Sequence, residues 1–180
     1  MGKFRFVPAP IEGVFEIEPT VFGDSRGYFL ETYNRRDFVE AGIAADFVQD
    51  NQSFSGKGIL RGMHFQETRP QAKLVRVLSG EVYDVCVDLR PGSPTFGRWH
   101  GVYLSGGNRR QFFVPRGLAH GFLVLSDTAE FAYKCDEFYY PQDERGFAWD
   151  DPGVGIRWPL DGIGRPLLSE KDAGLPPFAG

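Results

Sequence analysis

The chain has 180 residues, enough for one domain with a substantial hydrophobic core that needs no disulfides to hold it together. Its formal net charge of −4 argues against a nucleic-acid-binding protein, which normally carries an excess of lysine and arginine. No apolar run near the N-terminus has the length of a signal peptide, and none in the chain approaches a membrane span, so no membrane partner is expected.

Segments with period-two alternation, bounded by Gly, Asn, Asp and Pro, recur along the chain and predict strands. In chain order they lie within 11–22, over 28–33 and 47–53, in the strand-like stretch that begins at 59, and over 74–78, 82–89, 98–104, 111–114, 121–125 and 130–137. Residues 79–81 are expected to form a hairpin turn. Many short strands at this spacing indicate an all-β sandwich or barrel, and the absence of repeats or linkers predicts one domain over 1–180.

Two short helical segments are expected among the strands. Asn34 is a suitable N-cap for one or two helical turns over 35–41, which Gly42 would end. A second capped turn is predicted at 169–173, in the otherwise loop-rich region after Pro141.

The segment 82–89 has the clearest alternation. One face would carry Asp84, Cys86 and Asp88, and the other Tyr83, Val85, Val87 and Leu89. The only two cysteines, Cys86 and Cys135, both lie in strand-like segments, which predicts buried reduced thiols and suits a cytoplasmic protein.

The stretch from 59 to 73 concentrates chemically active side chains. It holds His64, one of only three histidines, together with Arg61 and Lys73. A neutral imidazole titrates near pH ~6.5 and can accept a proton, whereas the two cations attract anions and stabilise developing negative charge. The stretch therefore predicts a general base beside an anionic substrate.

A single histidine is more often a hydrogen-bonded core residue than a base, so His64 needs an orienting carboxylate on its second nitrogen. The candidates are Asp84, Asp88 and Asp172. Strict alternation would place Arg61 and His64 on opposite faces of a strand, whereas a bulge at Gly62 would bring both toward one cavity.

Other side chains have a structural and a functional interpretation. Tyr133 and the aromatic residues at 138–140 commonly pack in cores or on surfaces, but a hydroxyl could give a proton and a ring could stack on a flat base. Arg26, in a glycine-rich turn, is usually a solvated charge, and its functional alternative is a phosphate clamp.

Two kinds of site are disfavoured. No G-x-x-x-x-G-K-[ST] loop is present, and Gly153-Val-Gly155 lacks a third glycine, so a P-loop or Rossmann nucleotide site is not expected. His64, His100 and His120 are isolated, and a metal site built from His64, His120 and a distant acid is the weaker alternative.

Seven segments, taken in order, resemble the dTDP-4-dehydrorhamnose 3,5-epimerase family over nearly the whole chain. They are FGDSRGYF (22–29), FVQDN (47–51), LRGMHFQ (60–66), SPTFG (93–97), GLAHGF (117–122), YKC (133–135) and LSEKDA (168–173). Met63 stands where the family leads us to expect leucine, a substitution that conserves volume.

The resemblance implies a cupin-type jelly roll without a metal or other cofactor, and a homodimer in which strands cross to the partner. It implies that His64 is the base, that Asp172 holds its imidazole, and that Tyr133 is the acid on the opposite side of the sugar ring. Contacts to the nucleotide and its phosphates would come from Arg26, Glu31, Gln49, Asn51 and Arg61, some of them from the neighbouring subunit. Tyr139 would stack on the thymine, and the sugar or its phosphates would be lined by Lys73, His120, Glu144 and Lys171.

The implied reaction inverts C3 and C5 of dTDP-4-keto-6-deoxy-D-glucose to give dTDP-4-keto-L-rhamnose, in dTDP-L-rhamnose biosynthesis. The ketone acidifies both hydrogens, so inversion requires a base, an acid on the other side of the ring, and a group that stabilises the enolate oxygen. We expect His64 and Tyr133 to be the first two and Lys73 the third.

Three alternatives remain open at this point. A single-centre (3- or 5-) epimerase acting on a related nucleotide-linked 4-keto sugar is disfavoured by the presence of Tyr133. A catalytically silent sugar-nucleotide binder is disfavoured because His64, Asp172 and Tyr133 all occur. A metal-dependent cupin enzyme is disfavoured by the isolated histidines.

Overall fold

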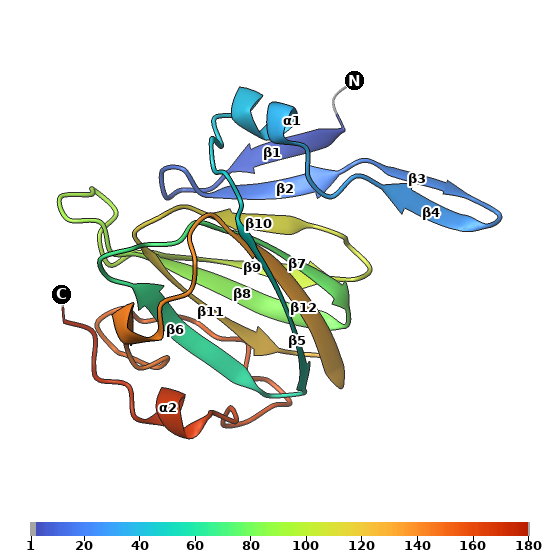
Figure 1. The fold of residues 1–180 in the computed structure, drawn as a ribbon. Helices are drawn as coiled ribbons and strands as arrows, with labels where there is room; N and C mark the ends of the chain where they lie inside the picture. Colours follow the sequence, from blue (N-terminus) through green and yellow to red (C-terminus); the bar gives the residue numbers. More distant parts are fainter. Residues whose placement is uncertain (1–2, 180) are drawn as a thin grey trace.

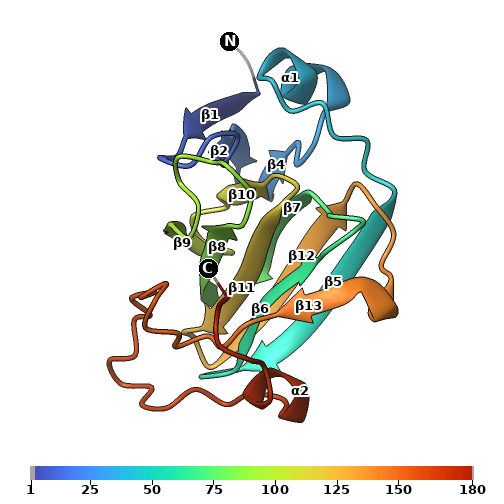
Figure 2. The ribbon, with the colours of Figure 1, turned by 90° about the vertical axis from the view of Figure 1, so that its left-hand side faces the viewer.

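The computed structural model describes residues 3–179, which form two antiparallel sheets packed face to face (Figures 1 and 2). The six-stranded sheet has the order β1 (Phe4–Pro8), β2 (Phe15–Pro19), β10 (Gln111–Val114), β7 (Lys73–Ser79), β12 (Thr128–Cys135) and β5 (Gln49–Gly56). The five-stranded sheet has the order β13 (Glu144–Gly146), β6 (Leu60–Gln66), β11 (Leu118–Val124), β8 (Glu81–Asp88) and β9 (Trp99–Ser105). The all-β jelly-roll sandwich expected from the sequence is confirmed.

The turn at residues 79–81 differs from the expectation. It does not close a hairpin, because β7 pairs with β10 and β12, whereas β8 pairs with β9 and β11 of the other sheet. Gly80 has a φ of +78°, and a Cβ there would lie 2.0 Å from the carbonyl oxygen of Thr128. The local sequence of a tight turn predicts a reversal of the chain, but it does not specify which strands pair after it.

The core between the sheets contains apolar side chains from both of them, including Val75, Phe112 and Phe131 of one sheet and Cys86 and Phe122 of the other. The alternation predicted for β8 is confirmed, since Cys86 faces this core. The opposite face of β8 is also buried, in a second cluster that contains Tyr83, Val85 and Val87 and packs against residues of the C-terminal segment.

Two short helices lie outside the sheets. Helix α1 (Arg35–Glu40) begins at Asn34, whose side chain accepts a hydrogen bond from the backbone of Arg36, as the capping signal predicts. Its Phe38 is buried with Ile17, Leu74 and Phe113 of the six-stranded sheet. Helix α2 (Glu170–Ala173) begins at Ser169 in the same way and contacts β6. Strands β1 and β13 are not among the predicted elements.

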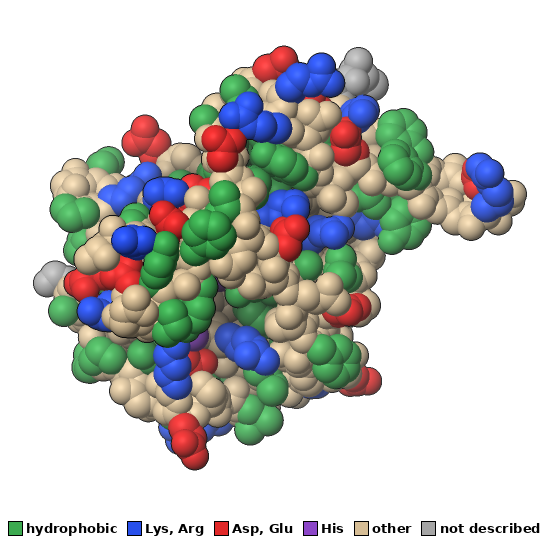
Figure 3. Space-filling model, in the orientation of Figure 1, with side chains coloured by type: hydrophobic (Ala, Val, Ile, Leu, Met, Phe, Trp, Pro, Cys, Tyr) green, Lys and Arg blue, Asp and Glu red, His purple; other side chains and the backbone are tan. Residues whose placement is uncertain are grey.

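A two-stranded ribbon, β3 (Val21–Asp24) and β4 (Gly27–Leu30), extends away from the sandwich (Figure 1). Its apolar side chains are exposed, up to 69% for Phe29, and Figure 3 shows them on the sides of the ribbon with charged side chains at its tip. Over residues 3–179 there is no helix with the length and hydrophobicity needed to span a membrane.

Candidate active site

A cavity of about 410 Å³ lies between the two sheets at one end of the sandwich. Both sheets and the C-terminal segment contribute to its wall. The lining residues are Asn51, Gln52, Ser53, Arg61, His64, Lys73, His120, Phe122, Phe131, Tyr133, Ser169, Lys171 and Asp172. The sequence did not identify Gln52, Ser53 and Ser169 as lining residues, nor the apolar wall made by Phe122 and Phe131, whose ring centroids lie 4.0 Å apart and which follow the inward alternation of their strands.

A bulge in β6 brings Arg61 and His64 into this one cavity. On β11 His120 pairs with His64 and Phe122 pairs with Arg61, so β6 has one more residue than β11 between the two pairs. The strands approach so closely there that a Cβ at Gly62 would lie 2.6 Å from the Cα of Gly121. Of the two arrangements that the sequence allowed, the bulge is the one that occurs.

His64 is held by Asp172, with 2.6 Å between Nε2 and the carboxylate Oδ1. Asp172 is buried, and burial would raise its pKa, but the hydrogen bonds from His64 and Ser169 outweigh this and lower the pKa of the carboxyl. On the other side of the ring, Nδ1 lies 3.8 Å from Glu144 Oε1. The neutral tautomer that donates from Nε2 to Asp172 therefore has its lone pair on Nδ1.

The other two candidate aspartates have different partners. Asp84 is fully buried and lies 2.8 Å from Nε2 of His120, so the cavity contains a second histidine held by a carboxylate. Burial raises the pKa of the Asp84 carboxyl, although His120 and Lys73 oppose this effect. Asp88 instead accepts hydrogen bonds from Arg90, Ser93 and Thr95, which anchor the loop between β8 and β9.

Replacing Asp88 by asparagine should reduce stability without affecting catalysis. Burial disfavours the Asp88 carboxylate, but its three partners lower its pKa below the ordinary value. We expect Asp88→Asn to lower the free energy of unfolding by about 2 kcal/mol at neutral pH, measured by urea denaturation. Because the folded-state pKa is depressed, the difference from the parent protein should shrink as the pH falls below about 4. A difference that grows on acidification would contradict this assignment.

Tyr133 and Lys73 face the cavity from the other sheet. Tyr133 belongs to β12 and Lys73 to β7, with the Lys73 ammonium 6.0 Å from the centre of the Tyr133 ring. Burial lowers the pKa of the Lys73 ammonium and raises the pKa of the Tyr133 phenol. Within the described residues the Lys73 ammonium forms no ion pair or hydrogen bond, so its charge is uncompensated by direct contact.

The remaining predicted residues near the cavity form a connected rim. Glu144 accepts a hydrogen bond of 2.5 Å from the Tyr139 hydroxyl and forms an ion pair with Lys171. The hydrogen bond to Glu144 raises the pKa of Tyr139 to about 12. Gln49 accepts from the backbone of Tyr139 and donates to Asn51. The ring of Tyr139 is 47% exposed and is therefore open to a stacking partner.

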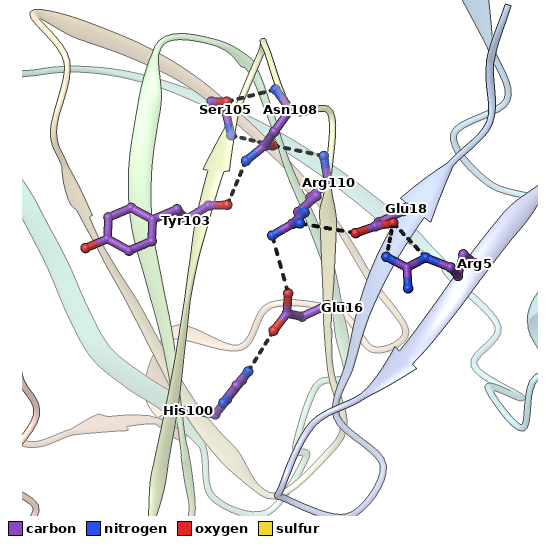
Figure 4. A network of polar contacts seen from close by, with 8 residues as sticks. All are labelled: Arg5, Glu16, Glu18, His100, Tyr103, Ser105, Asn108 and Arg110. Atoms are coloured by element: carbon purple, nitrogen blue, oxygen red, sulfur yellow. Dashed lines mark hydrogen bonds and ion pairs between the residues drawn. The ribbon is translucent and has the colours of Figure 1, made fainter.

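Arg26 and Glu31 lie away from this cavity in the same chain. Arg26 is at the tip of the β3–β4 ribbon, paired with Asp24, and Glu31 forms an ion pair with Lys3. His100 is also outside the cavity. Figure 4 shows it directed at Glu16, which with Glu18, Arg5 and Arg110 forms a polar network that joins β1, β2, β9 and the residue before β10. Within residues 3–179, no three His, Cys, Asp or Glu side chains are grouped so that they could hold a metal ion.

A histidine oriented by a carboxylate, facing a half-buried lysine and a phenol across one cavity, defines an enzyme that moves protons on and off an anionic substrate, as an isomerase does. A sequence model described as dTDP-4-dehydrorhamnose 3,5-epimerase matches residues 8–180. The chain is 56% identical over 163 residues to the dTDP-4-dehydrorhamnose 3,5-epimerase of Pseudomonas aeruginosa, which covers 90% of this chain and 89% of that protein.

It is 52% identical over 178 residues to the enzyme of the same name from Methanothermobacter thermautotrophicus, covering 99% of this chain and 96% of that protein. Among solved structures, the dTDP-6-deoxy-D-glucose-3,5-epimerase of Legionella pneumophila in complex with dTDP-4-keto-L-rhamnose aligns with a TM-score of 0.91. It is 46% identical and covers 98% of this chain and 100% of that one. The chain belongs to the dTDP-4-dehydrorhamnose 3,5-epimerase family.

Proposed function

We propose that the protein inverts C3 and C5 of dTDP-4-keto-6-deoxy-D-glucose to give dTDP-4-keto-L-rhamnose, a step in dTDP-L-rhamnose biosynthesis. The observation that carries the proposal is the placement in one cavity of His64, on the five-stranded sheet and held by Asp172 of α2, and of Tyr133, on the six-stranded sheet. Membership of the family supports inversion at both carbons rather than at one.

His64 acts as the base in this proposal and Asp172 as the group that orients it. The carboxylate accepts a hydrogen bond from Nε2–H, so the lone pair of Nδ1 is available to remove a proton from carbon. Asp172 also stabilises the imidazolium that forms when the proton arrives. Tyr133 is a phenol, protonated at neutral pH, whose pKa burial raises further, and it gives a proton to the other face of the ring.

Lys73 stabilises the enolate oxygen that develops on the ketone. Its ammonium lines the cavity and has no ion-pair partner among the described residues, so an oxyanion in the cavity would be its nearest strong acceptor. One well-placed charge stabiliser of this kind contributes ~10²–10³ in rate. His120, held by Asp84, lines the same cavity and contacts the sugar from the β11 side.

The nucleotide is bound at the rim. The exposed ring of Tyr139 stacks on the thymine, and Gln49, Asn51, Arg61 and Lys171 contact the nucleotide or its phosphates. Glu144 holds Tyr139 and Lys171 in place through its two contacts.

We also propose that the enzyme is a homodimer in which the β3–β4 ribbon lies on the partner and contributes Arg26 and Glu31 to its site. The exposed Phe22, Tyr28 and Phe29 support this, because a projecting ribbon with such side chains is left without apolar packing in one chain (Figure 3). Residues 1–180 form a single domain in this proposal, consistent with a family match over 8–180. The free, buried thiols of Cys86 and Cys135 support a cytoplasmic location.

Phe29→Asp should shift the protein from dimer to monomer. A charge in an apolar interface costs several kcal/mol unless it is paired, so the mass measured by light scattering during gel filtration should fall by half. Leu167→Asp is the matched control, since Leu167 is 63% exposed but lies in the C-terminal segment. A parent protein that is itself monomeric would contradict the proposed homodimer.

Incubation with the 4-keto-6-deoxy sugar nucleotide in D₂O, followed by NMR, tests the activity. Deuterium at both C3 and C5 of an inverted product is the expected result. Deuterium at one carbon only would indicate the single-centre alternative, and no incorporation would indicate a silent binder.

A further inference from the structure

The segment that carries Asp172 belongs to neither sheet. Residues 147–179 add no strand to the sandwich, and Asp172 lies in the four-residue helix α2. Figure 2 shows this segment running outside the sandwich, with α2 beyond the ends of β5 and β6. The 2.6 Å contact between Asp172 and His64 therefore depends on how the segment is attached.

Hydrogen bonds hold the segment on both sides of α2, to β6 and its preceding turn before the helix and to the start of the segment itself after it. Before the helix, Leu167 donates to the carbonyl of Gly58 at 2.8 Å and accepts from Leu60 at 3.0 Å. After it, two bonds join the C-terminal end of the segment to its own start, since Pro176 accepts from Ala148 at 2.8 Å and Phe178 donates to the Asp151 carboxylate at 2.9 Å; that start is bound to β6 by backbone bonds between Phe147 and Met63. These bonds fix the ends of the segment, and the helix itself is placed by side-chain contacts, which are the ion pair of Lys171 with Glu144 of β13 and apolar packing.

Leu175 supplies that packing at the point opposite the catalytic histidine. Gly146 of β13 pairs with His64 of β6, and a Cβ on Gly146 would lie 3.0 Å from both δ-carbons of Leu175 and 2.4 Å from the carbonyl oxygen of Met63. Gly146 does not have a positive φ, so it is space for Leu175 and the neighbouring strand that requires glycine here. The Leu175 backbone in turn donates to the Asp172 carbonyl at 3.4 Å.

We propose that Leu175, packed on Gly146, is a positioning residue that sets the distance between Asp172 and His64. It acts through the carboxylate and has no contact with the reacting atoms in this proposal, which rests on the proposed role of His64 as the base. Loosening this contact should let α2 move away from β6 and leave the imidazole without its orienting partner.

Leu175→Ala should lower kcat by about 10- to 100-fold, the size expected when a catalytic group is displaced by about 1 Å, and leave KM for the sugar nucleotide unchanged. In an Asp172→Asn background the same substitution should not lower kcat further, because the carboxylate that it would misplace is already absent. Leu175→Met, which preserves volume, should recover most of the activity. Leu167→Ala is the matched control, an exposed leucine of the same segment, and should be without effect.

Equal losses in the two backgrounds, or no loss in either, would overturn the proposal, because Leu175 would then act independently of Asp172. A full kcat in Asp172→Asn itself would instead contradict the proposed role of the His64–Asp172 pair, so the two failures are distinguishable. Thermal unfolding checks that each variant is folded, and should Leu175→Ala be unfolded, Leu175→Val supports the same cycle with a smaller expected loss.

Discussion

His64→Ala is expected to stop deuterium incorporation from D₂O at both C3 and C5 of the 4-keto sugar while leaving dTDP binding nearly unchanged. One base serves both carbons in the proposed mechanism, so both exchange reactions should fall together by ~10²–10⁴. Binding should persist because the nucleotide contacts proposed above lie at the rim, on Tyr139, Gln49 and their neighbours, rather than on the imidazole.

The matched control for this variant is His100→Ala. His100 is similarly half-buried and is also bound to a carboxylate, Glu16, but it lies outside the cavity (Figure 4). Its removal should leave both exchange rates at the parent level. Substantial exchange in His64→Ala would assign the base to another group, of which His120 with Asp84 is the nearest equivalent.

Tyr133→Phe is expected to separate proton removal from inversion. The variant keeps the ring that packs near Phe131, with centroids 5.9 Å apart, and loses only the hydroxyl. His64 can still remove a proton and return a deuteron to the same face, so exchange should continue. Net inversion should fall by ~10² or more, because no acid remains on the opposite face.

Both quantities come from one NMR time course, with deuterium content measured in recovered substrate and in inverted product. Tyr103→Phe, on the surface strand β9, is the control and should change neither. If exchange and inversion fall in equal proportion in Tyr133→Phe, the division of roles between the two residues is wrong.

Local patterns in the sequence predicted much of the fold. The period-two segments correspond to strands, the alternation of β8 assigned both of its faces correctly, and Asn34 and Ser169 cap helices where their residue types indicate. The hairpin predicted at Gly80 was wrong, because the choice of strands that pair after a turn depends on contacts distant in sequence. The three-residue β13 has too little pattern to be detected, and it exists because it pairs with β6.

The candidate site, like the fold, was predicted only in part from the sequence. Residues alone selected His64 but left three aspartates as equivalent partners, and only the folded chain places Asp172 next to it, 108 positions away, and Asp84 next to His120. The bulge beside Gly62 was one of two open arrangements, since a strand's register depends on its neighbour β11. The other candidate site residues were predicted from the resemblance to the family. Of these, Arg26 and Glu31 do not lie at the cavity of their own chain.

A crystal structure with the bound 4-keto sugar nucleotide tests the central claim most directly. The ring of the sugar should lie between His64 and Tyr133, with an imidazole nitrogen facing one side of C3 and C5, the phenol oxygen facing the other, and the Lys73 ammonium at the ketone oxygen. A complex in which the imidazole and the phenol approach the same side of the ring, or in which either is too far from it for proton transfer, would contradict the mechanism.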